Sequence, residues 1–397
     1  MLPSSLQTVG ILPVGALGAA FYYHLTRGCT ENQTRVQFIQ RRGSSNNAAL
    51  AQWGTLTIAG DGKVHSIEAP SACRPDLVTC GKLGWLPDIL LVCTQPDQLL
   101  PVVSDYVRLL EQFHHIYGLE SAISRLPLMI LSSNGIYHER VRRFLVELLE
   151  ESMLYGRLPD LWNDGMGLIV GKLIRGVTVQ TGYREGTGAE AVFCAGASAR
   201  TTLAGGEPGN RRRCSELLKS LGGWFEAAIT DAPVRVEFDK ALVNLWSNLL
   251  GQLKAINANG EFRLLRISEI FSDSDGAELR ELSGHLFAIG QAVRAYRPDE
   301  DFDQLHENTL RLSRSSGEHF PSSLKWIESE LNAGRLSPQL TPTEKWLLDP
   351  LVHYARTAGL DAAANYFSSL RQRIEQKLAA AIAFRNQTCT LLSSLKG

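Results

Sequence analysis

The stretch TVGILPVGALGAA, Thr8 to Ala20, combines a short apolar run, a glycine-containing turn and the start of a second apolar segment. This order predicts a β-strand, a tight turn and an α-helix. A G-x-G-x-x-G fingerprint indicates dinucleotide binding only when it stands between such a strand and helix. In the G-x-G-x-x-G register the three positions are Pro13, Gly15 and Gly18. Gly15 would let the backbone approach a pyrophosphate, and Gly18 would let the helix pack closely on the strand. A glycine-rich turn without a ligand is the alternative interpretation.

The first turn of this predicted helix contains Gly15, Ala16, Leu17 and Gly18. Its unpaired amides, at the positive end of the helix dipole, would face the phosphates of a dinucleotide. Pro13 takes the place of the first glycine and removes an amide donor, so the tight turn must be built differently from the common one.

Two arginines follow the second predicted strand, RVQFIQ. An NAD-specific site usually has an acidic residue at this point, whereas this chain has Arg41 and Arg42. Guanidinium groups suit the 2′-phosphate of NADP, so the pattern favours NADP if a dinucleotide binds. Solvated loop cations are the alternative. Another apolar run ends in SSNG, where Asn134 could reach a ligand at the carboxyl end of a strand or could simply mark a turn.

Four short apolar runs alternate with helical patterns and predict strands at residues 8–14, 35–40, 88–94 and 126–133. Near-continuous apolar strands separated by helices are typical of a parallel sheet covered on both faces, so the first domain is predicted to be a Rossmann-type α/β domain. A hairpin that turns at Asp61-Gly62 is expected between two of these strands. The β-rich segments 175–183 and 189–196 are expected to extend the sheet.

The pattern changes to successive helices after about residue 232, ending in a long helical segment from Leu360. The boundary is expected near VRVEF, Val234 to Phe238, which is interpreted as a short strand. The segment 335–345 contains two prolines and is interpreted as a loop. The predicted organisation is therefore an N-terminal Rossmann-type domain, residues 1–232, followed by an all-helical domain, residues 233–397.

Composition places the chain among ordinary soluble globular proteins, with 44% hydrophobic and 20% charged residues over 397 positions. The formal net charge of −1 gives no general attraction to nucleic acid or to a membrane. Seven cysteines stand singly, without a CxxC pair or a cluster with histidine, which argues against a structural metal and favours reduced thiols in the cytoplasm. The apolar run 10–25 lacks preceding cations and is short for a membrane span, so we expect neither a signal peptide nor an anchor.

The stretch FDKALVNLWSNLLG, Phe238 to Gly251, carries polar residues four apart among apolar neighbours. At 3.6 residues per turn, Lys240, Asn244 and Asn248 return to nearly the same side of a helix. A helix that is apolar on its other sides is normally buried, so this polar stripe must be satisfied internally or face a cavity. A satisfied core network and a catalytic site both remain open from the spacing alone.

In this order the features resemble those of ketopantoate reductase (2-dehydropantoate 2-reductase) and its relatives. The likeness covers the glycine turn, the arginine after the second strand, the strand ending in SNG, RGVTVQTGY and LGGWFEAAITDAPVRVEFDKALVNLWSN. Its most specific part is K-x-x-x-N-x-x-x-N, matched at Lys240, Asn244 and Asn248. The resemblance implies a Rossmann domain joined to a helical domain. It also implies reduction of a small 2-oxo acid by NADPH in the cleft between them, the family's step in pantothenate biosynthesis.

The resemblance also implies roles for individual residues. Lys240 would be the general acid that stabilises negative charge on the carbonyl oxygen and donates the proton. Asn244 and Asn248 would orient the lysine or the substrate. Asn134 would correspond to the family's asparagine after a sheet strand. The expected partner is a small-molecule substrate, and the resemblance leaves a homodimer open.

Beyond the glycine turn, the chain departs from the family pattern at two places. Cys93 follows the strand after which the family usually has a lysine. The family's serine and glutamate are represented by Ser322, or its neighbour Ser323, as a group for the substrate carboxylate, and by Glu344 as a candidate acidic partner of Lys240. The spacing between them is longer than in the family. These departures, with the proline at the glycine turn, motivate two alternatives: a non-catalytic nucleotide-binding or interaction protein, and a reductase of a bulkier 2-oxo acid or an imine.

Overall fold

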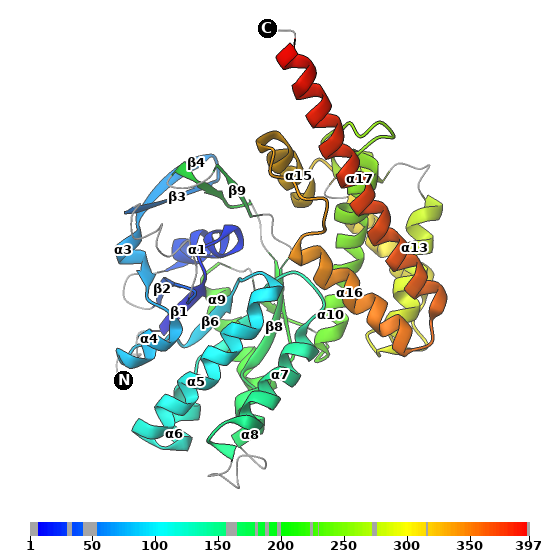
Figure 1. Ribbon diagram of the computed structural model, residues 1–397. Coiled ribbons are helices and arrows are strands. Elements are labelled where there is room, and N and C mark those ends of the chain that lie inside the picture. The colour runs from blue at the N-terminus through cyan, green and yellow to red at the C-terminus, as the bar shows by residue number, and fades with distance from the viewer. Residues whose placement is uncertain are drawn as a thin grey trace. The chain divides into compact units, whose positions relative to one another are not determined.

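The computed structural model describes residues 7–29, 34–42, 54–155, 165–178, 182–186, 190–196, 200–222, 225–228, 230–271, 276–314 and 317–394. The chain forms two compact units, residues 1–233 and residues 234–397 (Figure 1). The first unit is built on β-sheet and the second is helical.

The first unit contains an eight-stranded sheet in the order β12-β11-β8-β7-β6-β1-β2-β5. Its strands are β1 (Gln7–Leu12), β2 (Thr34–Ile39), β5 (Cys73–Arg74), β6 (Ile89–Val92), β7 (Leu128–Leu131), β8 (Leu173–Thr178), β11 (Thr201–Ala204) and β12 (Phe225–Ala227). The run from β5 to β8 is parallel throughout, and β11 joins β8 antiparallel. Numbered along the chain, β5-β2-β1-β6-β7-β8 is the Rossmann order 3-2-1-4-5-6. The four predicted strands are β1, β2, β6 and β7, so the predicted parallel sheet is confirmed.

Helices cover both faces of this sheet. From β1 the chain moves through α1 (Ala16–Gly28) to β2, and from β6 it moves in the opposite direction through α5 (Leu99–Tyr117) to β7. Right-handed crossovers therefore put α1 and α5 on opposite faces. α9 (Pro208–Ser220) shares the core beside α1, while α4 (Leu77–Lys82) and α7 (His138–Glu151) pack beside α5. The shorter helices are α3 (Ala69–Ala72), η1 (Pro96–Gln98), α6 (Leu119–Arg125) and α8 (Gly165–Val170).

A second, four-stranded sheet packs against the outer side of α1 (Figure 1). Its order is β4-β3-β10-β9, with β3 (Thr55–Gly60), β4 (Lys63–Glu68), β9 (Tyr183–Glu185) and β10 (Val192–Cys194). The predicted hairpin is confirmed as β3 and β4, and its turn residues Asp61 and Gly62 have φ of 49° and 73°. Positive φ at both turn positions is what a two-residue type I′ hairpin requires.

The expectation that residues 189–196 extend the main sheet is wrong. Within this segment Val192–Cys194 form β10, which pairs parallel with β3 in the small sheet. The main sheet already continues from β8 to β11, so β10 finds its partner on the far side of α1. Residues 175–178 do belong to the main sheet, within β8, whereas Tyr183 begins β9 of the small sheet; residues 179–181 lie outside the described residues.

The second unit is helical in the residues that the structure describes. Its helices are α10 (Pro233–Asn244), a π-helical segment η5 (Leu245–Leu250), α11 (Gly251–Ala255), α12 (Ile267–Ile270), α13 (Gly276–Ala292), α14 (Phe302–Arg314), α15 (Ser322–Ala333), α16 (Pro342–Thr357) and α17 (Asp361–Ser394). The long helix predicted from Leu360 is confirmed as α17, against which α13 and α16 pack (Figure 1).

The strand predicted at VRVEF is wrong, because these residues form the start of α10. Pro233 stands at the first helical position, where its fixed φ and missing amide favour a helix start. One turn further on, Arg235 Nε donates to Asp239 at 3.0 Å, an i,i+4 pair that is available only in a helix. Local helix signals therefore outweigh the β-propensity of the two valines.

The loop predicted over residues 335–345 ends earlier than expected, because α16 begins at Pro342. Thr341 and Glu344 form a capping box: Thr341 N donates to the Glu344 carboxylate at 2.9 Å, and Glu344 N donates to Thr341 Oγ1 at 3.4 Å. The sequence T-P-x-E is a helix-start signal of this type. Over the residues placed by the structure, no helix has the length and apolar character needed to cross a membrane.

Candidate active site

The predicted glycine turn lies at the carboxyl end of β1. Gly15 is the N-cap of α1, with extended backbone (φ −164°, ψ 179°) and no side chain to cap the first amides of the helix. A Cβ on Gly18 would lie 2.4 Å from the backbone oxygen of Pro13, so only glycine fits there, and the predicted close packing of helix and strand is confirmed. A Cβ on Gly15 would meet nothing within 4 Å. Among the described residues, therefore, no close contact accounts for Gly15, and helix amides without a side-chain cap are suited to binding a pyrophosphate.

Further polar groups stand at the same edge of the sheet, beyond β6 and β7. Ser133 Oγ donates to the carbonyl oxygen of Thr94, which ties the ends of these two strands together. Asn134 follows directly and is exposed. The hydroxyls of Thr94 and Ser132 are buried, and among the described residues neither has a hydrogen-bond partner. Since β1 and β6 are the strands at which the order reverses, this edge has the position where open α/β sheets bind ligands.

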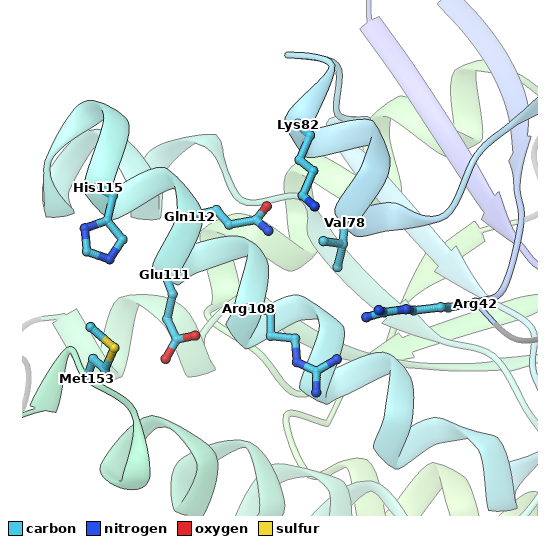
Figure 2. Close-up of a pocket in the computed structure, with 8 residues that line it drawn as sticks. All are labelled: Arg42, Val78, Lys82, Arg108, Glu111, Gln112, His115 and Met153. Atoms are coloured by element: carbon cyan, nitrogen blue, oxygen red, sulfur yellow. The ribbon is translucent and has the colours of Figure 1, made fainter.

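Of the two arginines after β2, Arg42 lines a cavity. Arg41 is half-buried and Arg42 is exposed, with Arg42 Nη1 3.8 Å from the carboxylate of Asp105. Arg42 lines a cavity of about 490 Å³ together with Lys82 from α4 and Arg108 from α5. Figure 2 shows the charged ends of these three side chains gathered on one side of that cavity. Arg108 Nη1 lies 3.4 Å from the same Asp105 carboxylate, and Glu111 also lines the cavity, so nearby carboxylates partly balance the three cations.

Cys93, by contrast, brings no charge to this edge. Burial raises the pKa of its thiol, so the side chain is neutral near pH 7. The family resemblance leads one to expect a lysine after β6. Cys93 stands there instead and supplies no cationic contact for a cofactor.

In the second unit the polar stripe is aligned by the change from α- to π-helix. In α10 the step of four residues from Lys240 to Asn244 turns about 400° around the helix axis, which is about 40° more than one full turn. Four residues from Asn244 to Asn248 in η5, at roughly 4.4 residues per turn, fall about 30° short of a full turn. The two deviations nearly cancel, and Asn248 Nδ2 lies 3.5 Å from Asn244 Oδ1. A short π-segment of this kind is often found at functional sites.

Lys240 is half-buried, whereas most residues around it on the helix are buried. Desolvation by burial lowers the pKa of its ammonium to about 8. Within the described residues no carboxylate pairs with it and no group hydrogen-bonds to it. Its neighbour Asp239 is occupied by Arg235, with an N–O distance of 3.0 Å. An uncompensated ammonium with a pKa near neutrality has the property of a general acid.

Of the two candidate serines, Ser323 is the one that contacts the stripe. Ser323 Oγ donates to Asn248 Oδ1 at 3.0 Å, and the pair links the start of α15 to η5. Ser322 is exposed and makes no hydrogen bond to the stripe. Asn244 is 7% exposed, so its amide is positioned inside the unit rather than at its surface.

Glu344 is also tied to this helix, but through a residue that the sequence analysis did not name. Gln252 Nε2 donates to the Glu344 carboxylate, which Thr341 also contacts from the capping box. Burial raises the pKa of Glu344. No ion pair joins Glu344 to Lys240 among the described residues. Gln252 stands four residues after Asn248, so the spacing that selected the first three polar residues could have selected it as well.

No protein-family model matches the chain, and neither does any curated protein sequence. Solved structures do match. A ternary complex of D-mandelate dehydrogenase with NADH and anilino(oxo)acetate superimposes with a TM-score of 0.65 at 16% identity, covering 94% of this chain and 99% of that one. A ketopantoate reductase from Ralstonia eutropha superimposes with a TM-score of 0.58 at 14% identity, covering 94% and 100%.

A dimeric ketopantoate reductase from Staphylococcus aureus also matches, with a TM-score of 0.52 at 13% identity and coverage of 92% and 99%. The likeness extends over nearly the whole of both chains in each case, and at these identities it establishes the fold. The chain therefore has the fold of the ketopantoate reductases, a Rossmann-type sheet domain followed by a helical domain.

Proposed function

We propose that the protein is an NADPH-dependent reductase that converts a small 2-oxo acid into the 2-hydroxy acid, with Lys240 as the general acid. The observation that carries the proposal is the half-buried ammonium of Lys240, which has a pKa lowered to about 8 and no partner among the described residues. Solved structures with this fold are oxidoreductases of 2-oxo or 2-hydroxy acids by name, which supports the reaction class.

The first unit would hold the cofactor at the carboxyl edge of its main sheet. The uncapped amides after Gly15 would bind the pyrophosphate. Because Gly15 has no side chain, the pyrophosphate could occupy the open space beside it. Arg41 and Arg42 would bind the 2′-phosphate, which favours NADPH over NADH. Asn134 would contact the cofactor or the substrate from the end of β7. When bound, the reduced nicotinamide supplies a hydride to the carbonyl carbon of the substrate.

The second unit would supply the proton and hold the substrate. The Lys240 ammonium would donate to the carbonyl oxygen and stabilise the charge that develops there. Asn244 and Asn248 would orient the ammonium and the substrate by amide hydrogen bonds. Ser323, held against Asn248, would bind the substrate carboxylate, a role that Ser322 was also expected to fill. Glu344 would act indirectly, by holding Gln252 and the start of α16 in place.

The test is NADPH oxidation by the purified full-length chain with a panel of 2-oxo acids that includes ketopantoate. Replacing Lys240 by alanine should lower kcat by at least about 100-fold, within the usual contribution of a general acid, while NADPH binding changes less than twofold. Equal losses of turnover and cofactor binding would indicate a structural lysine. A panel that gives no turnover at all would contradict the reductase proposal.

The panel should also contain larger substrates. One of the similar structures is named as a dehydrogenase of D-mandelate, which carries a phenyl ring on the 2-hydroxy acid, so phenylglyoxylate belongs beside ketopantoate. An imine of a 2-oxo acid tests the remaining alternative for the same chemistry, because an ammonium can protonate a nitrogen as well as an oxygen. The ratio of kcat/KM values then identifies the substrate class.

A non-catalytic nucleotide-binding protein is the second candidate. The neutral thiol of Cys93 and the engagement of Glu344 in a capping box are the observations that favour it. Calorimetry with NADPH separates the two, because tight binding without turnover would support the non-catalytic function. The proposal includes a homodimer, by analogy with the ketopantoate reductase described as dimeric, and sedimentation velocity tests it.

A further inference from the structure

A cavity of about 270 Å³ lies at the amino edge of the main sheet, opposite the edge that carries the glycine turn. Asp88, Leu128 and Lys172 stand at the amino ends of β6, β7 and β8 and line this cavity. Backbone bonds hold these ends together, since Leu128 N donates to Asp88 O and Met129 N donates to Lys172 O, each at 2.9 Å. With strands of four to six residues at about 3.3 Å each, the two edges are roughly 13–20 Å apart.

Three cations from separate elements line this cavity. Lys172 precedes β8, Arg125 ends α6 and Arg213 lies on α9. The Arg125 guanidinium lies over the ring of Tyr117, 4.1 Å from its centroid, and Lys172 Nζ donates to Leu126 O at 3.0 Å. Among the residues that the structure places, none of these cations forms an ion pair with a carboxylate.

The charge of the cavity is therefore not balanced from within. Asp88 is the one carboxylate among the lining residues, and it accepts hydrogen bonds from Thr8 N at 2.8 Å and from Thr8 Oγ1 at 3.1 Å. Burial, and then the charge of Arg213, lower the pKa of Lys172. The hydrogen bond to Leu126 O, directly after α6, accounts for the position of Lys172, but this single carbonyl oxygen carries no net negative charge. An anion would relieve the repulsion between the cations.

Of the three adjacent arginines Arg211 to Arg213, only one lines this cavity. Arg211 is 7% exposed, donates to Gly205 O at 2.8 Å and pairs with Asp231, so its function is structural. Arg212 is exposed and does not line the cavity. Arg213 lines it. Three adjacent arginines that look alike in the sequence thus have three different environments.

We propose that this cavity binds a phosphate group, either free or carried by a small ester, through Lys172, Arg125 and Arg213. Arginine forks bind phosphate oxygens in pairs, and a lysine adds a point charge. Tyr117, packed between Phe113 and the Arg125 guanidinium, is 41% exposed and gives the body of an ester an aromatic surface beside the cations. At about 270 Å³ the cavity is slightly smaller than the range of about 300–1,000 Å³ that is usual for drug-sized ligands, which suits a small phosphate ligand.

The proposal does not depend on the reductase function and is tested without turnover. Inorganic phosphate is titrated into the full chain by calorimetry, at an ionic strength held constant with sodium chloride, so that general screening does not contribute. The wild type should bind phosphate, and Arg213→Gln should weaken binding at least tenfold. Arg212→Gln, the matched control, should change it less than twofold. Arg213 is exposed, so its variant should fold, and Lys172→Met gives a second reading if it also folds.

The nucleotide edge could bind phosphate too, and a third variant separates the two sites. Phosphate binding that survives Arg213→Gln but is lost in Arg42→Gln would belong to the nucleotide edge and would overturn the proposal, as would a wild type that binds no phosphate. Phenyl phosphate identifies the form of the ligand. Tighter binding than inorganic phosphate, reduced by Tyr117→Ser, would support an ester, and equal binding of the two would support the free ion.

Discussion

Replacing Lys240 by methionine should make the protein more stable. The ammonium of Lys240 is desolvated without a partner among the described residues, and its pKa is lowered from 10.5 to about 8. Methionine has a similar length and helix propensity but no charge, so it removes the penalty while keeping the packing. A group whose folded-state pKa is depressed in this way opposes folding whenever it must be protonated.

The size of the effect follows from the shift. At 1.36 kcal/mol per pKa unit, the penalty in the wild type is about 3 kcal/mol at pH values well below 8. The penalty falls as the pH rises from 8 toward 10.5, because the folded protein releases the proton before the unfolded chain does. The free energy of unfolding of the methionine variant should therefore exceed that of the wild type by about 3 kcal/mol near pH 6 and by about 1.4 kcal/mol near pH 9.5.

The assay is urea unfolding followed by tryptophan fluorescence, to which the buried Trp246 on η5, directly after α10, contributes. Lys254→Met is the matched control, because Lys254 Nζ donates to Ile270 O at 2.6 Å and its loss should destabilise the protein at every pH. A Lys240→Met variant that is no more stable than the wild type near pH 6, or whose advantage does not shrink with rising pH, would refute the reasoning. Such a result would mean that the ammonium has a partner.

Three further predictions concern the glycine turn, the proton donor and the serines. Gly18→Ala should lower the free energy of unfolding by more than about 2 kcal/mol in a denaturant titration, because of the clash with a backbone oxygen. Gly15→Ala should lower it by only about 1 kcal/mol or less, since alanine is a poorer N-cap, and should weaken NADPH binding measured by calorimetry. If the Lys240 ammonium is the proton donor, kcat/KM for reduction should fall about tenfold per pH unit above about pH 8, and the rate of oxidation of the 2-hydroxy acid should rise over the same range. Ser323→Ala should lower kcat/KM about fivefold, the value of one neutral hydrogen bond, while Ser322→Ala should leave it unchanged in the same steady-state assay.

Where short-range signals act within one element, the sequence was sufficient. The apolar run, the glycines and the following helix at Thr8 to Ala20 predict a strand, a turn and a helix because each signal concerns neighbouring residues. The turn at Asp61-Gly62 predicts its hairpin for the same reason. Fold class followed from the alternation of such elements, and the observed strand order agrees with it.

The sequence was not sufficient to predict contacts between a strand or side chain and a partner that is distant in the chain. Residues 192–194 look like any strand, and their place in the small sheet depends on β3, which is more than 130 positions earlier in the chain. VRVEF has the composition of a strand, yet it forms the start of α10, where Pro233 and the Arg235–Asp239 pair favour helix. Register and pairing are set by which surfaces become buried together, and local sequence does not specify this.

The candidate site shows the same division. The sequence by itself determined that Lys240, Asn244 and Asn248 share one side of a helix, because side-chain direction follows from residue spacing. Only the tertiary structure decided that Ser323 rather than Ser322 meets Asn248, and that a π-turn brings the stripe into line. The lowered pKa of Lys240 also depends on the tertiary structure, because it results from the atoms elsewhere in the chain that exclude solvent from the ammonium.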